Sequence, residues 1–165
     1  MLVSVSRRTD IPARYAAWFI NRVRAGEVYT RNPHNPAQLT RVPLSPDAVD
    51  GFVFWSKDPA PLASFLPELT AMGYAWYLQF TLTPYGKDIE RGLREKAAIA
   101  QTFCDIAARH GAQRLVWRYD PILLTEELDP AWHKVQFERL CRRLSGCTDT
   151  VTVSFVDTYG KNDPR

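Results

Sequence analysis

The sequence predicts an α/β fold in which parallel (βα) units form part of a TIM-barrel-like sheet, with an inserted β-hairpin. Five short apolar runs each end in polar or charged residues, and helix-like segments separate most of them. The runs are rich in Val, Phe and Trp, as buried parallel strands are. Parallel α/β folds build their sites at the carboxyl ends of their strands, so these polar clusters mark the expected site.

The five expected strands occupy residues 2–6, 51–55, 76–83, 114–120 and 151–157. Strand–helix alternation fits an open doubly wound sheet as well as a closed barrel. Polar residues at all five strand ends favour the barrel, because an open sheet concentrates its site at one switch point. A complete barrel has eight strands and about 200 residues or more. We therefore expect the chain to be a single domain over residues 1–165, forming the N-terminal part of a longer barrel.

Four segments between the strands have the spacing of amphipathic helices. Gly26, Gly73 and Gly111 end the first three, and Asp129-Pro130 is a typical start for the fourth. The residues expected to face the core are Tyr15, Phe19, Ile20 and Val23; Leu62, Phe65, Leu66, Leu69 and Met72; Leu93, Ala97, Ala100, Phe103, Cys104 and Ala107; and Phe137, Leu140, Cys141 and Leu144.

Residues 27–42 interrupt the alternation. Two β-like runs, 27–31 and 38–42, flank the turn sequence Asn-Pro-His-Asn-Pro at 32–36. This pattern predicts a hairpin inserted between the first helix and the second main strand. His34 on the turn and His133 at a helix start are expected to be solvated surface residues.

The bulk composition is that of a soluble globular protein, with 45% hydrophobic and 24% charged residues. The net charge of +3 is too small to imply nucleic acid by itself. No apolar stretch approaches the roughly 20 residues that span a bilayer. The N-terminal charges follow the apolar run, the reverse of a signal peptide, so we expect a cytoplasmic protein without membrane contact.

Three cysteines, Cys104, Cys141 and Cys147, are widely spaced and odd in number. This spacing does not suggest a disulfide framework or a metal site. Cys104 and Cys141 are expected to be buried thiols that pack as small hydrophobic groups. The chain itself is thus expected to hold no metal and no cofactor.

Charged residues follow the first strand. Arg7 and Arg8 lie just before a helix start, where two guanidinium groups would bind a phosphate or carboxylate through paired hydrogen bonds. Asp10 is a candidate for the same binding site. Its alternative role is to cap the helix that begins near residue 11.

The candidate catalytic residues are Lys57, Asp120 and Asp157, each at a strand end. A desolvated lysine there can form a Schiff base, although a salt bridge to one of the two aspartates is the more common role. Asp120 is a candidate general base, or a turn former because it precedes Pro121. Asp157 ends the last expected strand, with no predicted helix after it to cap.

Further substrate-binding candidates carry polar or cationic groups at the same strand ends and at the hairpin tip. Gln79, Thr81 and Thr83 alternate on one face of the third expected strand. Burying three polar side chains against a sheet core costs free energy unless they line a water-filled cavity or hydrogen-bond to one another. Arg118 would serve as a cationic anchor on the face that it shares with Asp120. The candidates are Arg31, Asn32, Gln79, Thr81, Thr83 and Arg118. We expect Arg8, Lys57, Thr81, Arg118, Asp120 and Asp157 to converge in one cleft.

Several runs resemble a bacterial family of domain proteins of unknown function, in order and spacing over essentially the whole chain. The matching runs are residues 4–12, 31–33, 53–57, 79–83, 117–121 and 154–157. Full-length members of that family carry a C-terminal cysteine cluster similar to that of radical S-adenosylmethionine enzymes. The resemblance implies an iron–sulfur cluster and S-adenosylmethionine for a complete protein. This chain has no such cysteine cluster.

Two functions fit these observations. The first is a barrel-type enzyme, or its N-terminal fragment, that binds a small anionic substrate at the strand ends. The second is a nucleotide- or nucleic-acid-binding module without catalysis, because arginines and aromatic residues together grip phosphates and stack bases. The second is less favoured, since Trp117 and Tyr119 alternate away from Arg118. An open edge at the fifth strand also predicts self-association.

Overall fold

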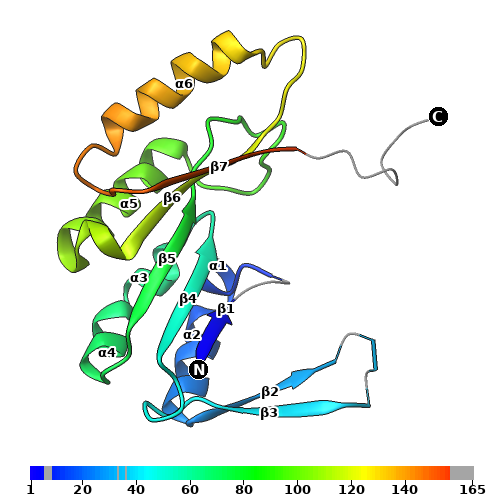
Figure 1. Ribbon diagram of the computed structural model, residues 1–165, viewed down its shortest axis with the longest axis vertical. Coiled ribbons are helices and arrows are strands. Elements are labelled where there is room, and N and C mark those ends of the chain that lie inside the picture. Colours follow the sequence, from blue (N-terminus) through cyan, green and yellow to red (C-terminus); the bar gives the residue numbers. More distant parts are fainter. Residues whose placement is uncertain (6–8, 33, 36, 157–165) are drawn as a thin grey trace. The chain divides into compact units, whose positions relative to one another are not determined.

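The computed structural model describes residues 1–5, 9–32, 34–35 and 37–156, and contains a five-stranded parallel sheet and a separate antiparallel hairpin (Figure 1). The sheet order is β1–β4–β5–β6–β7, which is the order of these strands along the chain. The bounds are β1 Leu2–Val5, β4 Gly51–Ser56, β5 Trp76–Thr81, β6 Leu115–Ile122 and β7 Val151–Phe155. The predicted parallel sheet and its inserted hairpin are confirmed. Over the described residues the sheet is open and does not close into a barrel.

The chain divides into two compact units, residues 1–79 and 80–165. The prediction of a single domain stays a prediction. The first unit adds the elements α1 Ile11–Arg14, α2 Ala16–Arg24, β2 Glu27–Arg31, β3 Leu39–Pro43, α3 Ala60–Ala63 and α4 Leu66–Ala71. The second adds α5 Lys96–His110, the short 3-10 helix η1 Ala112–Arg114 and α6 Pro130–Arg143.

The core of the first unit is an aromatic contact between α2 and β4. The ring of Phe19 meets Phe52 and Phe54 edge-on, with centroids 5.2 and 5.4 Å apart. Ile20 and Val23 are buried on the same helix face, as the spacing predicts. The prediction for Tyr15 is wrong: this residue lies between α1 and α2 and is 51% exposed.

The second predicted helix is also interrupted. Leu62 lies on α3, while Leu66 and Leu69 lie on α4, and all three are buried. Phe65 precedes α4 and is only half-buried. Pro67 occupies the first turn of α4. A proline lacks the N–H needed inside a helix but fits its first turn, so the helix starts afresh there.

The hairpin pairs β2 with β3 in antiparallel register from Glu27 opposite Pro43 to Arg31 opposite Leu39. Its tip is held by Asn32, whose amide Nδ2 donates to Gln38 Oε1 at 2.7 Å. Gly26 begins the hairpin with φ +74°, a conformation in the left-handed region that glycine adopts without strain. Figure 1 shows the hairpin projecting away from β1 and β4.

The core of the second unit is formed by helix side chains packed on β5 and β6. Phe103 of α5 lies 4.8 Å from Phe80, and Phe137 of α6 stacks on Trp117 at 5.0 Å, between ring centroids. Asp129 caps α6 by accepting from the Trp132 N–H at 2.7 Å. The predicted start of this helix is thereby confirmed.

Four predictions about helix faces in this unit need correction. Leu93 precedes α5, and Ala97 lies on its exposed side. Cys141 is exposed rather than buried, because the inward stripe of α6 follows Phe137 and Leu144 and leaves Cys141 at its margin. His133 is buried, 6% exposed, and is not a surface residue. It lies one turn before Phe137, so it shares that inward face.

No helix in the described parts of the chain is long and apolar enough to cross a membrane.

Strand β7 pairs with β6 and all five of its residues are exposed. Val151, Val153 and Phe155 are 43%, 50% and 64% exposed and alternate on one face. An apolar edge strand that the described residues leave uncovered pairs readily with another chain. We therefore expect two copies of this chain to associate through β7.

The measurement is light scattering or sedimentation over a range of concentrations, comparing the unaltered chain with Val153→Lys. The lysine adds a charge to the edge and should shift the chain toward monomer. Tyr77→Lys, on another strand, serves as a control for added charge. An unaltered chain that stays monomeric at high concentration would contradict this prediction.

Candidate functional site

The strongest polar cluster on the sheet in the second unit joins Arg118, Asp120 and Ser154. Trp117 and Tyr119 pack against α6, so alternation puts Arg118 and Asp120 on the opposite face of β6. The Arg118 guanidinium forms an ion pair with the Asp120 carboxylate. The Ser154 hydroxyl on β7 donates to the other oxygen of the same carboxylate. Three side chains from two parallel strands thus meet near the carboxyl end of β6.

The ion pair of this cluster is partly shielded from water, whereas Ser154 is exposed. The side chains of Arg118 and Asp120 are 24% and 12% exposed. Burial lowers the pKa of Arg118, although a guanidinium stays charged at physiological pH. The β6–β7 pairing is irregular between Tyr119 and Ile122, where Asp120 and Pro121 lie. A strand irregularity at this position re-aims side chains, which is common beside functional sites.

The three polar residues predicted at the end of the third strand, Gln79, Thr81 and Thr83, divide into two groups. Gln79 is half-buried and Thr81, the last residue of the strand, is 9% exposed. Thr83 lies beyond the strand end, and its hydroxyl donates to Glu90 Oε2 at 2.8 Å. Thr83 is therefore part of a different network from the Arg118 cluster.

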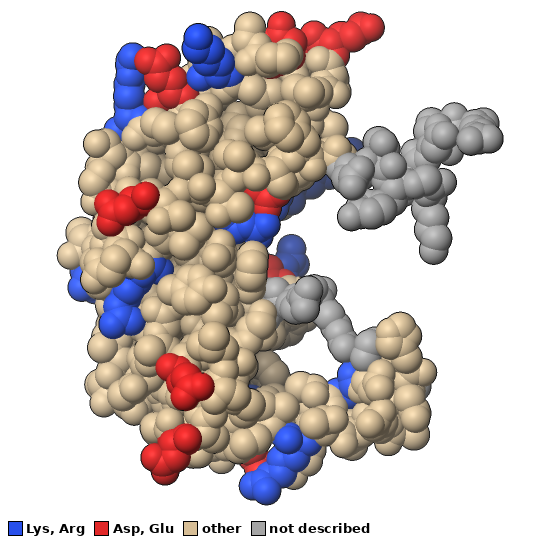
Figure 2. All heavy atoms as spheres, viewed as in Figure 1, with Lys and Arg blue, Asp and Glu red and all other residues tan. Residues whose placement is uncertain are grey.

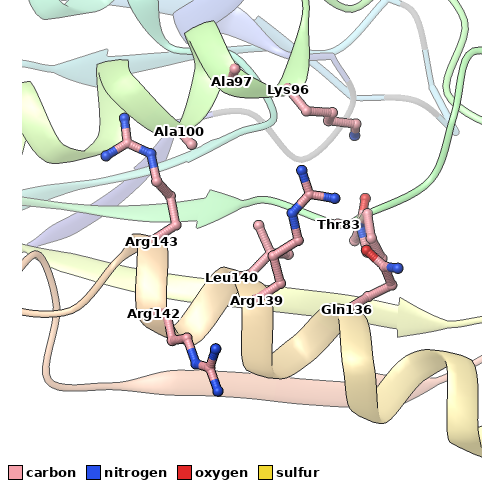
Figure 3. Close-up of a pocket in the computed structure, with 10 residues that line it drawn as sticks. Thr83, Lys96, Ala97, Ala100, Gln136, Arg139, Leu140, Arg142 and Arg143 are labelled. Atoms are coloured by element: carbon pink, nitrogen blue, oxygen red, sulfur yellow. The ribbon is translucent and has the colours of Figure 1, made fainter.

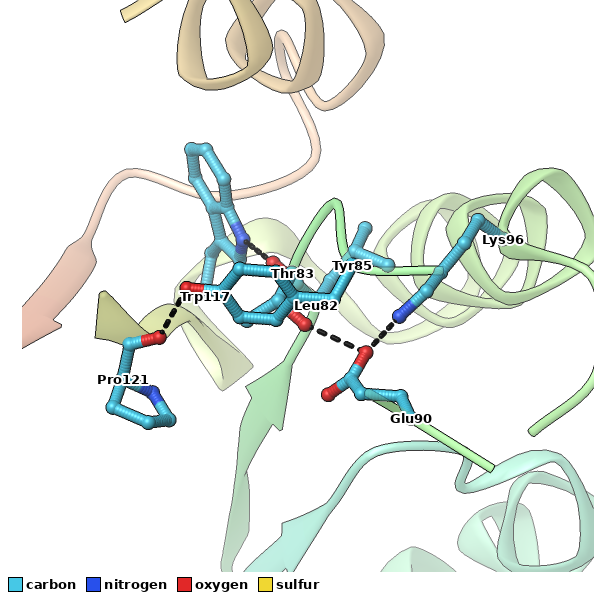
Figure 4. A network of polar contacts seen from close by, with 7 residues as sticks. All are labelled: Leu82, Thr83, Tyr85, Glu90, Lys96, Trp117 and Pro121. Atoms are coloured by element: carbon cyan, nitrogen blue, oxygen red, sulfur yellow. Dashed lines mark hydrogen bonds and ion pairs between the residues drawn. The ribbon is translucent and has the colours of Figure 1, made fainter. Parts of the chain in front are cut away.

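That network contains a buried carboxylate, Glu90, which the sequence analysis missed. Its side chain is 5% exposed and forms an ion pair with Lys96 at the start of α5 (Figure 4). Nearby, the Trp117 indole N–H donates to the Leu82 carbonyl at 2.9 Å, and the Tyr85 hydroxyl donates to the Pro121 carbonyl at 2.7 Å. The loop after β5 is thus fixed to β6 and α5 by buried polar contacts. Glu90 stands in a charged loop sequence without apolar alternation, so no pattern indicated that it is buried.

His133 is another buried polar residue, although its sequence position predicted a place on the surface. Its Nε2 lies 2.9 Å from the Leu123 carbonyl, which can only accept, so this nitrogen carries the proton. Its Nδ1 then accepts from the Tyr119 hydroxyl at 2.8 Å. Burial raises the pKa of Tyr119, with a smaller contribution from Tyr85, so the hydroxyl is protonated and donates.

The first unit holds a separate polar cluster around Asp10. The carboxylate caps α1 by accepting from the Ala13 N–H at 3.0 Å, which confirms the capping interpretation. Its other oxygen accepts from the Ser56 hydroxyl at 2.9 Å and from the Lys57 backbone N–H at 3.0 Å. Asp10 thereby joins the loop after β1 to the end of β4. The side chain of Lys57 is half-buried.

The remaining predicted site residues lie on the hairpin or outside the described residues. Arg31 is exposed at the end of β2, and Asn32 shapes the hairpin tip. Arg7, Arg8 and Asp157 lie outside the described residues. The expected convergence of six side chains in one cleft therefore stays a prediction.

The cysteines of the described chain do not gather into a ligand set. Within residues 1–5, 9–32, 34–35 and 37–156, no three His, Cys, Asp or Glu side chains lie close enough to hold a metal ion. Cys104 and Cys147 are neighbours, and burial, followed by contact with Cys147, raises the pKa of Cys104 to about 12.

The comparisons with known proteins identify a family. A family model described as a domain of unknown function, DUF1848, matches residues 2–165. Neither the search of curated proteins nor the search of solved structures gave a match. The match covers nearly the whole chain, including all seven strands and all six α-helices of the described part. The chain therefore belongs to the DUF1848 family.

Proposed function

We propose that this chain is part of a (βα)-type enzyme that binds a small anionic substrate on the face of β6 and β7 away from α6. The observation that carries the proposal is the cluster of Arg118, Asp120 and Ser154. A shielded ion pair is weak evidence for stability, because removing two charges from water costs about as much as their attraction returns. Its position at strand ends of a parallel sheet supports a role in binding.

Within this proposal Arg118 contacts the anion and Asp120 acts on protons. The guanidinium carries five N–H donors in a planar fork, which suits phosphate or carboxylate. Asp120 holds that fork in one orientation, and Ser154 in turn holds the Asp120 carboxylate. Asp120 also serves as the candidate general base, and Lys57 and Asp157 remain proposed catalytic residues.

The nucleic-acid-binding alternative is disfavoured by the positions of two of the aromatic residues on which it rests. Trp117 and Tyr119 are 2% and 1% exposed and pack on α6, so neither ring is available for stacking on a base. In the face shown in Figure 2, basic and acidic side chains are intermixed. A protein that binds nucleic acid backbone usually gathers its positive charge on one face.

We also propose that any iron–sulfur cluster of full-length relatives is held by cysteines outside this chain. The arrangement of Cys104, Cys141 and Cys147 does not fit such a cluster, because no three-ligand set exists among the described residues. S-adenosylmethionine chemistry would likewise belong to that complete protein. The role proposed for this chain is to position the anionic substrate.

The test is a titration of the isotope-labelled chain with inorganic phosphate and with malonate, followed residue by residue by NMR. We expect shifts at residues 116–120 and 152–154 in the unaltered chain. Arg118→Ala should weaken this binding by about tenfold or more, as expected for the loss of a charge-assisted hydrogen bond. Arg118→Lys keeps the charge but not the fork, and should bind with intermediate affinity. Equal affinity in the unaltered chain and in Arg118→Ala would disprove the site.

A further inference from the structure

A pocket of about 650 Å³ with a cationic lining lies between α5 and α6, on the helix side of the second unit. This size falls within the range of small-molecule sites. Every residue of this pocket belongs to α5, α6 or the loop after β5. We refer to these residues as the α5–α6 pocket: Thr83, Pro84, Lys96, Ala97, Ala100, Gln136, Arg139, Leu140, Arg142 and Arg143.

The lining of the α5–α6 pocket combines cationic and apolar residues, and both helices contribute residues of each kind. Four of its residues are Lys or Arg and none is Asp or Glu. Figure 3 shows Arg139 and Arg143 rising from α6 toward α5, with Lys96 reaching toward Arg139 from α5. Arg142, by contrast, points away from the pocket. Arg139 and Arg143 are four residues apart, so they project from one face of α6.

The positive charge of this pocket is only partly neutralised. The ammonium of Lys96 is paired with the buried Glu90, and Arg142 is paired with Glu138 at 2.6 Å. Arg143 donates to a neutral acceptor, Gln101 Oε1, at 2.5 Å. Arg139 has no hydrogen-bond or ion-pair partner among the described residues. Two guanidinium groups, Arg139 and Arg143, are therefore left without a carboxylate.

We propose that the α5–α6 pocket binds an organic phosphate monoester. A phosphate monoester carries a charge of about −1.5 to −2 at neutral pH, which matches the two guanidinium groups that lack a carboxylate. Arg139 and Arg143 bind the phosphate oxygens, and Gln136 adds an amide donor beside them. Ala97, Ala100 and Leu140 form an apolar floor for the organic group. Because Arg139 is exposed and unpaired in the described chain, the phosphate displaces no existing ion pair there.

This site is distinct from the one proposed around Arg118. The side chains of Trp117 and Tyr119 face α6, whereas Arg118 lies on the other face of β6. The two sites share no residue, so each can be removed without the other. A failure at one leaves the other proposal standing.

The test uses calorimetry together with NMR of the arginine Nε–Hε groups, with inorganic phosphate, phenyl phosphate and phenol as probes. We expect phenyl phosphate to bind more tightly than inorganic phosphate, and phenol not to bind, with shifts at Arg139 and Arg143. Arg139→Gln and Arg143→Gln should each lower the affinity for phenyl phosphate by about tenfold. Lys134→Gln removes a positive charge from the same helix outside the pocket and is the control that should leave the affinity unchanged.

A further variant tests the apolar floor. Ala97→Leu, on the exposed side of α5, alters this floor. It should abolish the higher affinity for phenyl phosphate relative to inorganic phosphate, and leave the affinity for inorganic phosphate unchanged. Raising the salt concentration should weaken the binding of both phosphates, since salt screens the charges of the arginines and the ligand. Equal loss of affinity in Lys134→Gln and Arg139→Gln would mean attraction to the general surface charge and would overturn the proposal. Unchanged affinity in Arg139→Gln and Arg143→Gln would overturn it as well.

Discussion

Replacing His133 with alanine is expected to lower the free energy of unfolding by about 4 kcal/mol, the sum of a cavity and unsatisfied polar groups. The imidazole accepts from Tyr119, donates to the Leu123 carbonyl, and contacts the rings of Tyr85 and Trp132 edge-on. Tyr119 is 1% exposed, so its hydroxyl lies away from bulk water when the imidazole is removed. Thermal or denaturant unfolding, followed by circular dichroism, measures the loss.

A double-mutant cycle separates the hydrogen bond from the packing. Tyr119→Phe leaves His133 Nδ1 without a donor, and His133→Phe leaves the Tyr119 hydroxyl without an acceptor. Together the two changes remove both polar groups, so the double variant should be about 1–2 kcal/mol more stable than the sum of the single losses predicts. Additive losses would mean that the hydrogen bond between these two residues contributes little.

Replacing Asp120 with alanine is expected to cost about 2–3 kcal/mol of unfolding free energy. The substitution leaves Arg118 partly buried without its carboxylate and removes the acceptor of the Ser154 hydroxyl. A fully buried pair would cost about 3–5 kcal/mol when broken. Arg118 remains 24% exposed, so water compensates in part.

Asp120→Asn is the informative companion variant. The amide keeps an acceptor for Ser154 but loses the charge that pairs with Arg118. We expect an intermediate loss of stability in low salt, and a smaller difference from the unaltered chain in high salt. Denaturant unfolding at two salt concentrations checks this. A stability of Asp120→Ala equal to that of the unaltered chain would show that the pair is not shielded as described.

Much of the fold could be predicted because its signals are local. The strand order follows from five apolar runs in sequence, and the hairpin follows from its Asn-Pro turn residues. Asp10 and Asp129 both cap helices, as their positions before a proline-containing first turn predict. Each of these features depends on neighbours within a few residues.

The features that could not be predicted depend on contacts between residues that are distant in the sequence. His133 is buried because Tyr119, 14 residues earlier, supplies a donor to it. Its spacing of four from Phe137 was the available signal for an inward position. The α5–α6 pocket needs Lys96 and Arg139, from two different helices, to face each other. Charged residues on an amphipathic helix usually contact solvent, so their spacing alone did not indicate a pocket.

The alternation of β6 has a consequence for how this family can diverge. Positions 117 and 119 are occupied by the rings that pack on α6, while positions 118 and 120 carry the charged groups on the other side. Substitutions at the second pair therefore leave the packing between β6 and α6 in place. Insertion or deletion of one residue within β6 would exchange the two sets and turn a guanidinium toward Phe137. We therefore expect this strand to tolerate substitution at positions 118 and 120 more readily than a change in its length.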